Sequence, residues 1–204
     1  LPWYWNGYEQ TTKYTYHLRQ LGTEEDLWNE IESKIRTDIR KARKNYVSIN
    51  ISENINKFWT VLLKTYNRQG LKPSFSFEYV KRLDSILCQQ NARRIFLAHD
   101  QQNRVHAGIY LVWNSDCAWY LMGGGDPELR SSGATSLAMW EAIQFSSTVA
   151  KTFDFEGSMM EPVERFFRGF GAIQTPYFRI KKTPNGLLAG ALSGLNLFRT
   201  MRSN

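Results

Sequence analysis

The residues best suited to chemistry lie between Leu121 and Glu141, where three glycines lead through a polar loop into an apolar helix. The glycines at 123–125 allow the backbone to turn sharply and to approach a ligand closely. The small residues at 131–134 leave the amide N–H groups of the helix start accessible, and these groups, with the helix dipole, can hold a phosphate. Arg130 would add a charged fork to the same site. This stretch is therefore a candidate anion-binding loop.

An ordinary connection between a strand and a helix also explains this loop. Glycine and serine are common in turns, and Asp126 and Glu128 place negative charge close to where a phosphate would bind. The stretch has neither a lysine after a GxxxxG spacing nor a GxGxxG spacing, so it is not a P-loop or a dinucleotide-binding loop. Both the anion site and the plain connection stay open at this point.

Regular elements are predicted on both sides of the loop. The helix expected over residues 135–150 is apolar almost all round, which indicates burial against a sheet. Three strand-like runs at 94–99, 104–113 and 117–122 precede the loop and are separated by turn-rich sequences. This pattern predicts an antiparallel meander whose last strand ends in the glycines.

A short strand is predicted after the long helix, at residues 152–156. Alternation along it places two phenylalanines on one face and Asp154 and Glu156 on the other. A helix over 161–170 and a strand over 177–181 follow.

A long helix is predicted over residues 23–44, and a capping box at 23–26 begins it. Its buried stripe consists of Leu27, Ile31, Ile35, Ile39 and Ala42. Arg36, Arg40 and Lys44 recur every four residues and share one face. A solvated helix face and a surface for an anionic partner both explain these cations.

Composition limits the class of protein. The 204 residues are 42% hydrophobic and 14% aromatic, which suits one folded domain, alone or with an appendage. The 26 Lys and Arg against 19 Asp and Glu give a net charge of +7, which favours anionic partners such as phosphorylated cofactors, nucleic acid or a membrane surface.

Metal and membrane signals are absent from the sequence pattern. Two cysteines without a CxxC spacing predict neither a disulfide framework nor a zinc site. His99 and His106 are expected to be surface or sheet residues rather than metal ligands. No signal peptide or membrane-spanning run is recognised, and a cytoplasmic location is expected.

The order of these elements resembles the GNAT N-acyltransferase fold, an α/β (α+β) fold with a mixed, mostly antiparallel sheet flanked by helices. More specifically, the chain is similar to the FemAB-like, methicillin-resistance-protein-like branch of that family. The resemblance covers residues 33–181. Five segments carry it in order: KIRTDIRKARK (34–44), AGIYLVW (107–113), YLMGGGDPELRSSGATSLAMWEAI (120–143), FDFEGSM (153–159) and EPVERFFRGFGA (161–172).

The resemblance implies acyl-CoA as the donor and no metal. In GNAT proteins the loop before the long helix binds the pyrophosphate of the cofactor in an (R/Q)xxGx(G/A) pattern. The residues at these positions are Arg130, Ser131, Ser132, Gly133, Ala134 and Thr135, with threonine where the family has glycine or alanine. Backbone N–H groups near Met122 and Gly123 would hold the developing oxyanion.

The implied reaction is direct transfer of the acyl group from the thioester to an amine. Glu156 is the first candidate for the base that takes the proton of the amine, and Asp154 is the second. A carboxylate that is only paired with Arg165 or Arg168 is the structural alternative. Anionic groups of the acceptor would be held by Arg36, Arg40 and Arg68.

Fem peptidyltransferases use aminoacyl-tRNA and bear an FKxGFG-like motif whose lysine stabilises charge. The matching stretch is 166–171, where Phe167 stands at the lysine position and Arg168 beside it would take over that role. A tRNA-dependent reaction on a cell-wall precursor is therefore an alternative. A degenerate domain that binds a partner without catalysis is another.

Three segments are expected along the chain. Fem-like proteins generally contain two GNAT-like halves, and this chain resembles the C-terminal half. Residues 1–22 would be a strand and connector from an N-terminal half, and residues 23–182 the acyltransferase domain. Residues 183–204 would form an apolar helix or tail that docks on the domain, with a hydrophobic partner or peripheral membrane contact as the alternatives.

Overall fold

The computed structural model describes residues 2–157 and 159–183, and they form two compact units. One unit runs from Tyr14 to Thr175, and the other combines residues 2–13 with 176–183. The main unit therefore begins before residue 23, the start predicted for the domain. The reason is that His17 and Leu18 pair with a strand near the end of that unit. The predicted tail over 183–204 lies almost wholly outside the described residues.

The sheet has seven strands in the order β2-β3-β4-β5-β6-β1-β7. All of the described pairings are antiparallel except that between β5 and β6, which is parallel. The strands are β1 (Glu9–Leu18), β2 (Ser48–Ser52), β3 (Arg93–His99), β4 (Val105–Trp113), β5 (Cys117–Gly125), β6 (Thr152–Asp154) and β7 (Ile173–Lys181). The predicted meander is confirmed as β3, β4 and β5. Its last strand ends in the glycines as predicted, and it includes all three of them.

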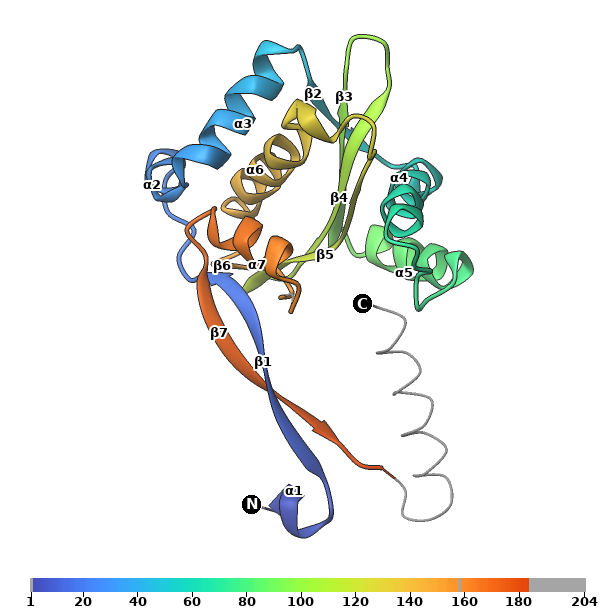
Figure 1. Cartoon of the computed structure of the whole chain (residues 1–204), viewed down its shortest axis with the longest axis vertical. Coiled ribbons are helices and arrows are strands. Elements are labelled where there is room, and N and C mark those ends of the chain that lie inside the picture. The colour runs from blue at the N-terminus through green and yellow to red at the C-terminus, as the bar shows by residue number, and fades with distance from the viewer. Residues whose placement is uncertain (1, 158, 184–204) are drawn as a thin grey trace. The chain divides into compact units, whose positions relative to one another are not determined.

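Helices cover both faces of the sheet in the main unit, with α2, α3 and α6 along one face and α4 and α5 along the other (Figure 1). The helices are α1 (Pro2–Trp5), α2 (Glu24–Glu30), α3 (Ser33–Lys44), α4 (Ile55–Arg68), α5 (Phe77–Gln89), α6 (Ala134–Ser146) and α7 (Glu161–Arg168). Among the helices of the described residues, none has the length and apolarity needed to cross a membrane.

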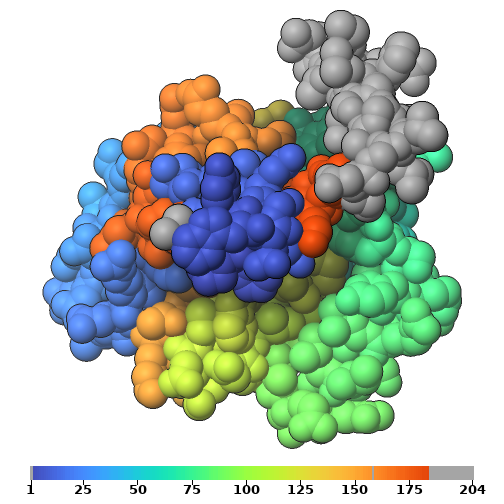
Figure 2. Space-filling view, turned by 90° about the horizontal axis from the view of Figure 1, so that it is seen from below, coloured from blue at the N-terminus to red at the C-terminus, as the bar shows by residue number. Residues whose placement is uncertain are grey.

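Figure 2 shows the same two layers from below. Residues of α2 and α3, in light blue, lie on one side, and those of α5, in green, lie on the other. The yellow-green turn between β4 and β5 lies between them. The sheet is thus enclosed from both sides at the strands that lead into the candidate loop.

The core is built around α6, as its apolar sequence predicts. Nine of its residues are buried, among them Trp140, and they pack between the sheet and α3. A separate apolar cluster lies under α4 and α5. Gly124 of β5 allows α4 to pack closely against the sheet, because a Cβ at position 124 would meet the backbone of Leu62.

One continuous helix was predicted over residues 23–44, and that prediction was wrong. The structure has two helices, α2 and α3, which are separated by Ile31 and Glu32. The predicted capping box at Thr23 and the five buried apolar residues are confirmed. The interruption occurs because the Glu32 amide donates to the carbonyl oxygen of Gly169 at 2.8 Å, a partner just beyond α7. The Glu32 amide therefore bonds the residue that follows α7 instead of a carbonyl oxygen within its own helix.

Candidate functional site

Strands β5 and β6 separate at the centre of the sheet. Their pairing ends at Trp119 and Asp154, whereas β5 continues alone on that edge from Tyr120 to Gly125. The unpaired edge therefore presents backbone groups that no neighbouring strand of the described chain uses. Parallel strands that part at their carboxyl ends commonly leave a ligand-binding gap.

A β-bulge lies where this gap begins. Tyr110 of β4 pairs with Met122 and the next residue, Leu111, pairs with Tyr120, so Leu121 is the extra residue. A bulge bends its strand and re-aims neighbouring groups. The bulge therefore turns β5 away from β6 beside Met122 and Gly123, the predicted oxyanion donors.

Tyr120 fills the space beside the bulge, and sequence reasoning did not single it out. Its hydroxyl lies so close to Gly123 that a Cβ there would overlap it. Burial, reinforced by the nearby Tyr66, raises the pKa of Tyr120 to about 12, so the hydroxyl keeps its proton at neutral pH. The available signal was a tyrosine three positions before the run of glycines at 123–125.

The predicted anion loop leads through a short 3-10 turn, η1 (Arg130–Ser132), into α6. The Ala134 amide donates to Oγ of Ser132 at 3.3 Å. No acceptor within the described chain receives the amides of Gly133, Thr135 and Ser136. Arg130 is exposed and forms no ion pair with any described residue. Unsatisfied amides at a helix start beside a free cation are the elements of an anion site.

Gly133 has a packing role as well as a conformational one. Its φ of 80° lies in the left-handed region. A Cβ there would overlap the backbone carbonyl oxygen of Asp38 on α3. Glycine at this position is therefore required for the contact between α3 and the start of α6, whether or not a ligand binds.

The carboxylates at the end of β6 differ in how they are held. The strand ends at Asp154, so the prediction that Glu156 ends it was wrong; Glu156 lies beyond it with φ of 62°. Asp154 accepts hydrogen bonds from the Thr15 hydroxyl and from the Glu156 amide at 2.8 Å, and its Oδ2 lies 3.0 Å from Nε2 of His17. The carboxylate of Glu156 has no such partners among the described residues.

The environment of Glu156 suits a base. Its side chain reaches solvent, but partial burial of its carboxyl group and the negative charge of Asp154 raise its pKa. The structural alternative, a carboxylate paired with Arg165 or Arg168, does not hold. These arginines pair with Glu161 at 3.0 Å and with Glu164 at 3.3 Å, each one turn away on α7.

The predicted acceptor-binding arginines are not brought together. Arg36 donates from Nη1 to the carbonyl oxygens of Trp28 and Asn29 at 3.3 Å, and Arg40 lies over the Trp28 ring at 5.6 Å. Both therefore fasten α2 to α3. Arg68 lies at the end of α4, on the opposite side of the sheet, and is exposed. Their role toward an acceptor stays a prediction.

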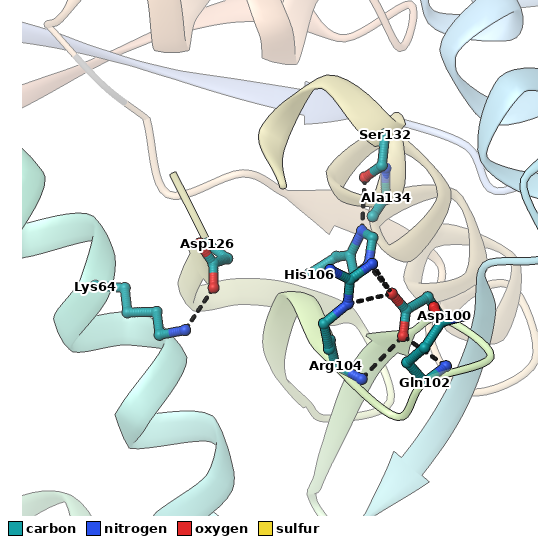
Figure 3. A network of polar contacts seen from close by, with 8 residues as sticks. All are labelled: Lys64, Asp100, Gln102, Arg104, His106, Asp126, Ser132 and Ala134. Atoms are coloured by element: carbon teal, nitrogen blue, oxygen red, sulfur yellow. Dashed lines mark hydrogen bonds and ion pairs between the residues drawn. The ribbon is translucent and has the colours of Figure 1, made fainter. Parts of the chain in front are cut away.

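A buried polar chain behind the α6 start was also missed (Figure 3). His106 of β4 lies with Nδ1 2.9 Å from Oγ of Ser132 and with Nε2 3.1 Å from Oδ2 of Asp100. His106 is 6% exposed, so it is a sheet residue as predicted, but one with two specific partners. In the described part of the chain no cluster of three or more His, Cys, Asp or Glu could hold a metal ion.

A hollow of about 970 Å³ lies on the α4 side, against β2, the ends of β3 and β4, and the loop after β5. Neither β6 nor residues 120–125 line it. Two of its three cations are already engaged: Lys64 bonds Asp126, and Arg104 bonds Asp100. The hollow is therefore separate from the gap between β5 and β6, and Lys57 is the cation there without an ion pair among the described residues.

Comparisons with known proteins identify the family and the fold. A family model described as an acetyltransferase (GNAT) domain matches residues 33–166. A search of curated proteins gave no match. Among solved structures, FemX superposes with a TM-score of 0.73 at 14% identity, over 87% of this chain and 67% of that one.

Two further structures share the fold. L-PGS from Bacillus licheniformis superposes with a TM-score of 0.59 at 10% identity, over 96% of this chain and 68% of that one. A tandem GNAT protein from the clavulanic acid biosynthesis pathway superposes with a TM-score of 0.53 at 10% identity, over 86% of this chain and 54% of that one. These likenesses establish a common fold and no shared substrate.

Proposed function

This chain belongs to the GNAT acetyltransferase family, and we propose that it transfers an acyl group from acyl-CoA to an amine by direct attack within a ternary complex. The observation that carries the proposal is the gap between β5 and β6, which opens at a bulge on β5. The chain continues from β5 through η1 to the unbonded amides at the start of α6. A thioester in the gap and a pyrophosphate at the helix would use both features.

The donor would be held at its charged end by residues 130–136. The amides of Gly133, Thr135 and Ser136 supply hydrogen bonds, the dipole of the 13-residue helix α6 favours negative charge, and Arg130 supplies a full positive charge. Thr135 replaces the last small residue of the family pattern. Its backbone amide is nevertheless unbonded within the described chain, so the threonine leaves this donor in place.

The acyl group would lie beside the bulge of β5. Backbone N–H groups near Met122 and Gly123, on the edge that β6 has left, would stabilise negative charge on the carbonyl oxygen as the amine attacks. Because these donors belong to a sheet packed on both faces, they are held in place before the reaction begins.

The reaction would use two side chains at this gap. The amine nitrogen bonds to the acyl carbon, Glu156 takes its proton, and the carbon–sulfur bond breaks. Tyr120, which keeps its proton at neutral pH, would donate a hydrogen bond to the departing sulfur, and the thiolate takes its proton from solvent. Asp154 is engaged by Thr15, His17 and the Glu156 amide, so it would position Glu156 and raise its pKa.

Thermal unfolding with CoA, acetyl-CoA and a bulk tRNA control tests the donor. A ligand at about 100 times its dissociation constant adds about 2.7 kcal/mol, or several degrees, to the stability of a domain of this size. We expect CoA and acetyl-CoA to raise the midpoint and tRNA to leave it unchanged. A shift with tRNA alone would replace acyl-CoA by an aminoacyl-tRNA donor.

The variant Arg130→Ala tests the site of binding. Losing a charged hydrogen-bond donor should weaken CoA binding about ten-fold or more. Arg82→Ala is the matched control, because Arg82 is also exposed and lies on α5 across the sheet. Equal CoA affinity in both variants would place the pyrophosphate elsewhere.

A further inference from the structure

Three hydrogen-bonded side chains, Asp100, His106 and Ser132, end at the proposed pyrophosphate site but have no part in the reaction above (Figure 3). Ser132 belongs to η1, directly before α6, and its Oγ already accepts the Ala134 amide. His106 reaches the same oxygen with Nδ1 at 2.9 Å. The hydroxyl therefore lies between a buried imidazole and the amides that would bind an anion.

Asp100 fixes one end of this hydrogen-bonded set. Its Oδ1 accepts the backbone amides of Gln102 at 3.0 Å and Arg104 at 2.9 Å, and its Oδ2 accepts Nε of Arg104 at 2.7 Å. Burial alone would raise the pKa of Asp100, but the hydrogen bonds from His106 and Arg104 outweigh it and hold that pKa well below its usual range. Because Asp100 stays a carboxylate, Nε2 of His106 is its N–H donor whether the ring is neutral or charged.

The direction of the Ser132 hydroxyl then depends on the charge of His106. In the neutral ring Nδ1 is an acceptor, so Ser132 gives its one proton to His106 and offers an incoming anion only lone pairs. In the charged ring Nδ1–H donates to Oγ, and the hydroxyl proton is free to point toward a ligand. The charged ring also places a positive charge directly behind the helix start.

We propose that His106 is a proton-linked positioning residue, which takes up a proton when a phosphate group binds at the start of α6 and so turns the Ser132 hydroxyl into a donor to that group. The inference rests on the proposed function, whose site it refines. By linkage, donor affinity rises as the pH falls through the range in which histidine titrates, and donor release returns the proton to solvent.

The other charged groups around His106 keep their charge over that range. Asp100 and Arg104 face it from the turn between β3 and β4. Asp126 faces it from the loop after β5, and the hydrogen bond from Lys64 of α4 lowers the pKa of Asp126. The proposed proton uptake therefore concerns His106 alone within this cluster, apart from any group of the ligand.

The test is calorimetric titration with dephospho-CoA, whose pyrophosphate carries the same charge at pH 6 and at pH 8. Wild-type protein should bind it about five-fold more tightly or better at pH 6, with net proton uptake revealed by buffers of different ionisation enthalpy. His106→Gln, which can still bond Asp100 but does not titrate, should lose the pH dependence. His99→Gln is the matched control, since His99 contacts the Leu97 carbonyl oxygen instead, and should keep it.

Ser132→Ala separates positioning from folding. It should keep the affinity seen at pH 8 and reduce the gain at pH 6 to the part that the charge of His106 supplies, whereas a merely structural serine would weaken binding equally at both values. This inference is overturned if the wild-type affinity is the same at pH 6 and pH 8, or if His106→Gln keeps the full pH dependence. The proposed function would survive either result. Absence of binding at both values overturns the proposed function and this inference with it.

Discussion

At the scale of single residues, the proposed base is Glu156, whose pKa is raised by partial burial and by the charge of Asp154. Replacing Glu156 by glutamine should lower kcat/KM by about 10²- to 10⁴-fold, because Asp154, the other candidate base, is held by partners of its own. Glu161→Gln is the matched control, since Glu161 is an exposed carboxylate on α7 that only pairs with Arg165. Steady-state rates with acetyl-CoA and an amine panel measure both. An E156Q enzyme with wild-type turnover would remove Glu156 from the mechanism.

The pH profile gives a second residue-scale prediction. A base acts deprotonated, so activity should fall as the pH drops through the pKa of Glu156, which partial burial and Asp154 raise above the ordinary glutamate value. Asp154→Asn removes the negative neighbour, and the acid limb of kcat/KM should therefore move to lower pH. An acid limb that stays in place in D154N would show that a different group controls it.

At the scale of elements, the contact between α3 and α6 depends on Gly133. Alanine there must adopt the left-handed conformation and also overlaps the carbonyl oxygen of Asp38. Gly70 is the matched control, because it has φ of 66° with open space where a Cβ would lie. Gly70→Ala should cost about 1 kcal/mol of unfolding free energy and Gly133→Ala about 3 kcal/mol or more, measured by urea denaturation. Equal costs would mean that α3 moves aside freely.

Elements whose partners are local were predictable from sequence. The all-round apolar pattern after residue 134 predicted a buried helix because burial follows directly from composition. For the loop at 130–135 the sequence left two interpretations open, an anion site or a plain connection, and the anion site stays a prediction. The break at Glu32 was not predictable, because its cause is a hydrogen bond to Gly169, far along the chain.

Site residues that depend on distant contacts were missed for the same reason. Tyr120 gains its place from a bulge that only the pairing of β4 with β5 reveals. His106 looks like any strand histidine until the β3–β4 turn brings Asp100 and η1 brings Ser132 to its two nitrogens. A sequence pattern shows which residues are polar. The proposed roles of Tyr120 and His106 depend instead on which atoms the fold brings into contact.

At the scale of the whole molecule, the net charge of +7 should assist an anionic donor. CoA affinity is expected to fall roughly five-fold between 50 and 300 mM salt, because added ions screen the field that attracts its phosphates. Pantetheine, which lacks the phosphates, is the matched control and should bind equally at both salt concentrations. Isothermal titration measures each. Salt-independent CoA binding would mean that contacts other than charge dominate.

The position of β1 between β6 and β7 has a consequence for how the molecule is made. Thr15 and Asp154 meet although 139 positions separate them along the chain. During synthesis β1 therefore leaves the ribosome long before β6 and β7. It stays unpaired until these two strands have been translated. Such long-range closure slows folding and leaves a strand open to wrong partners. Because the same closure fixes Asp154 beside Glu156, we expect acyl transfer to appear only after synthesis of the sheet is complete.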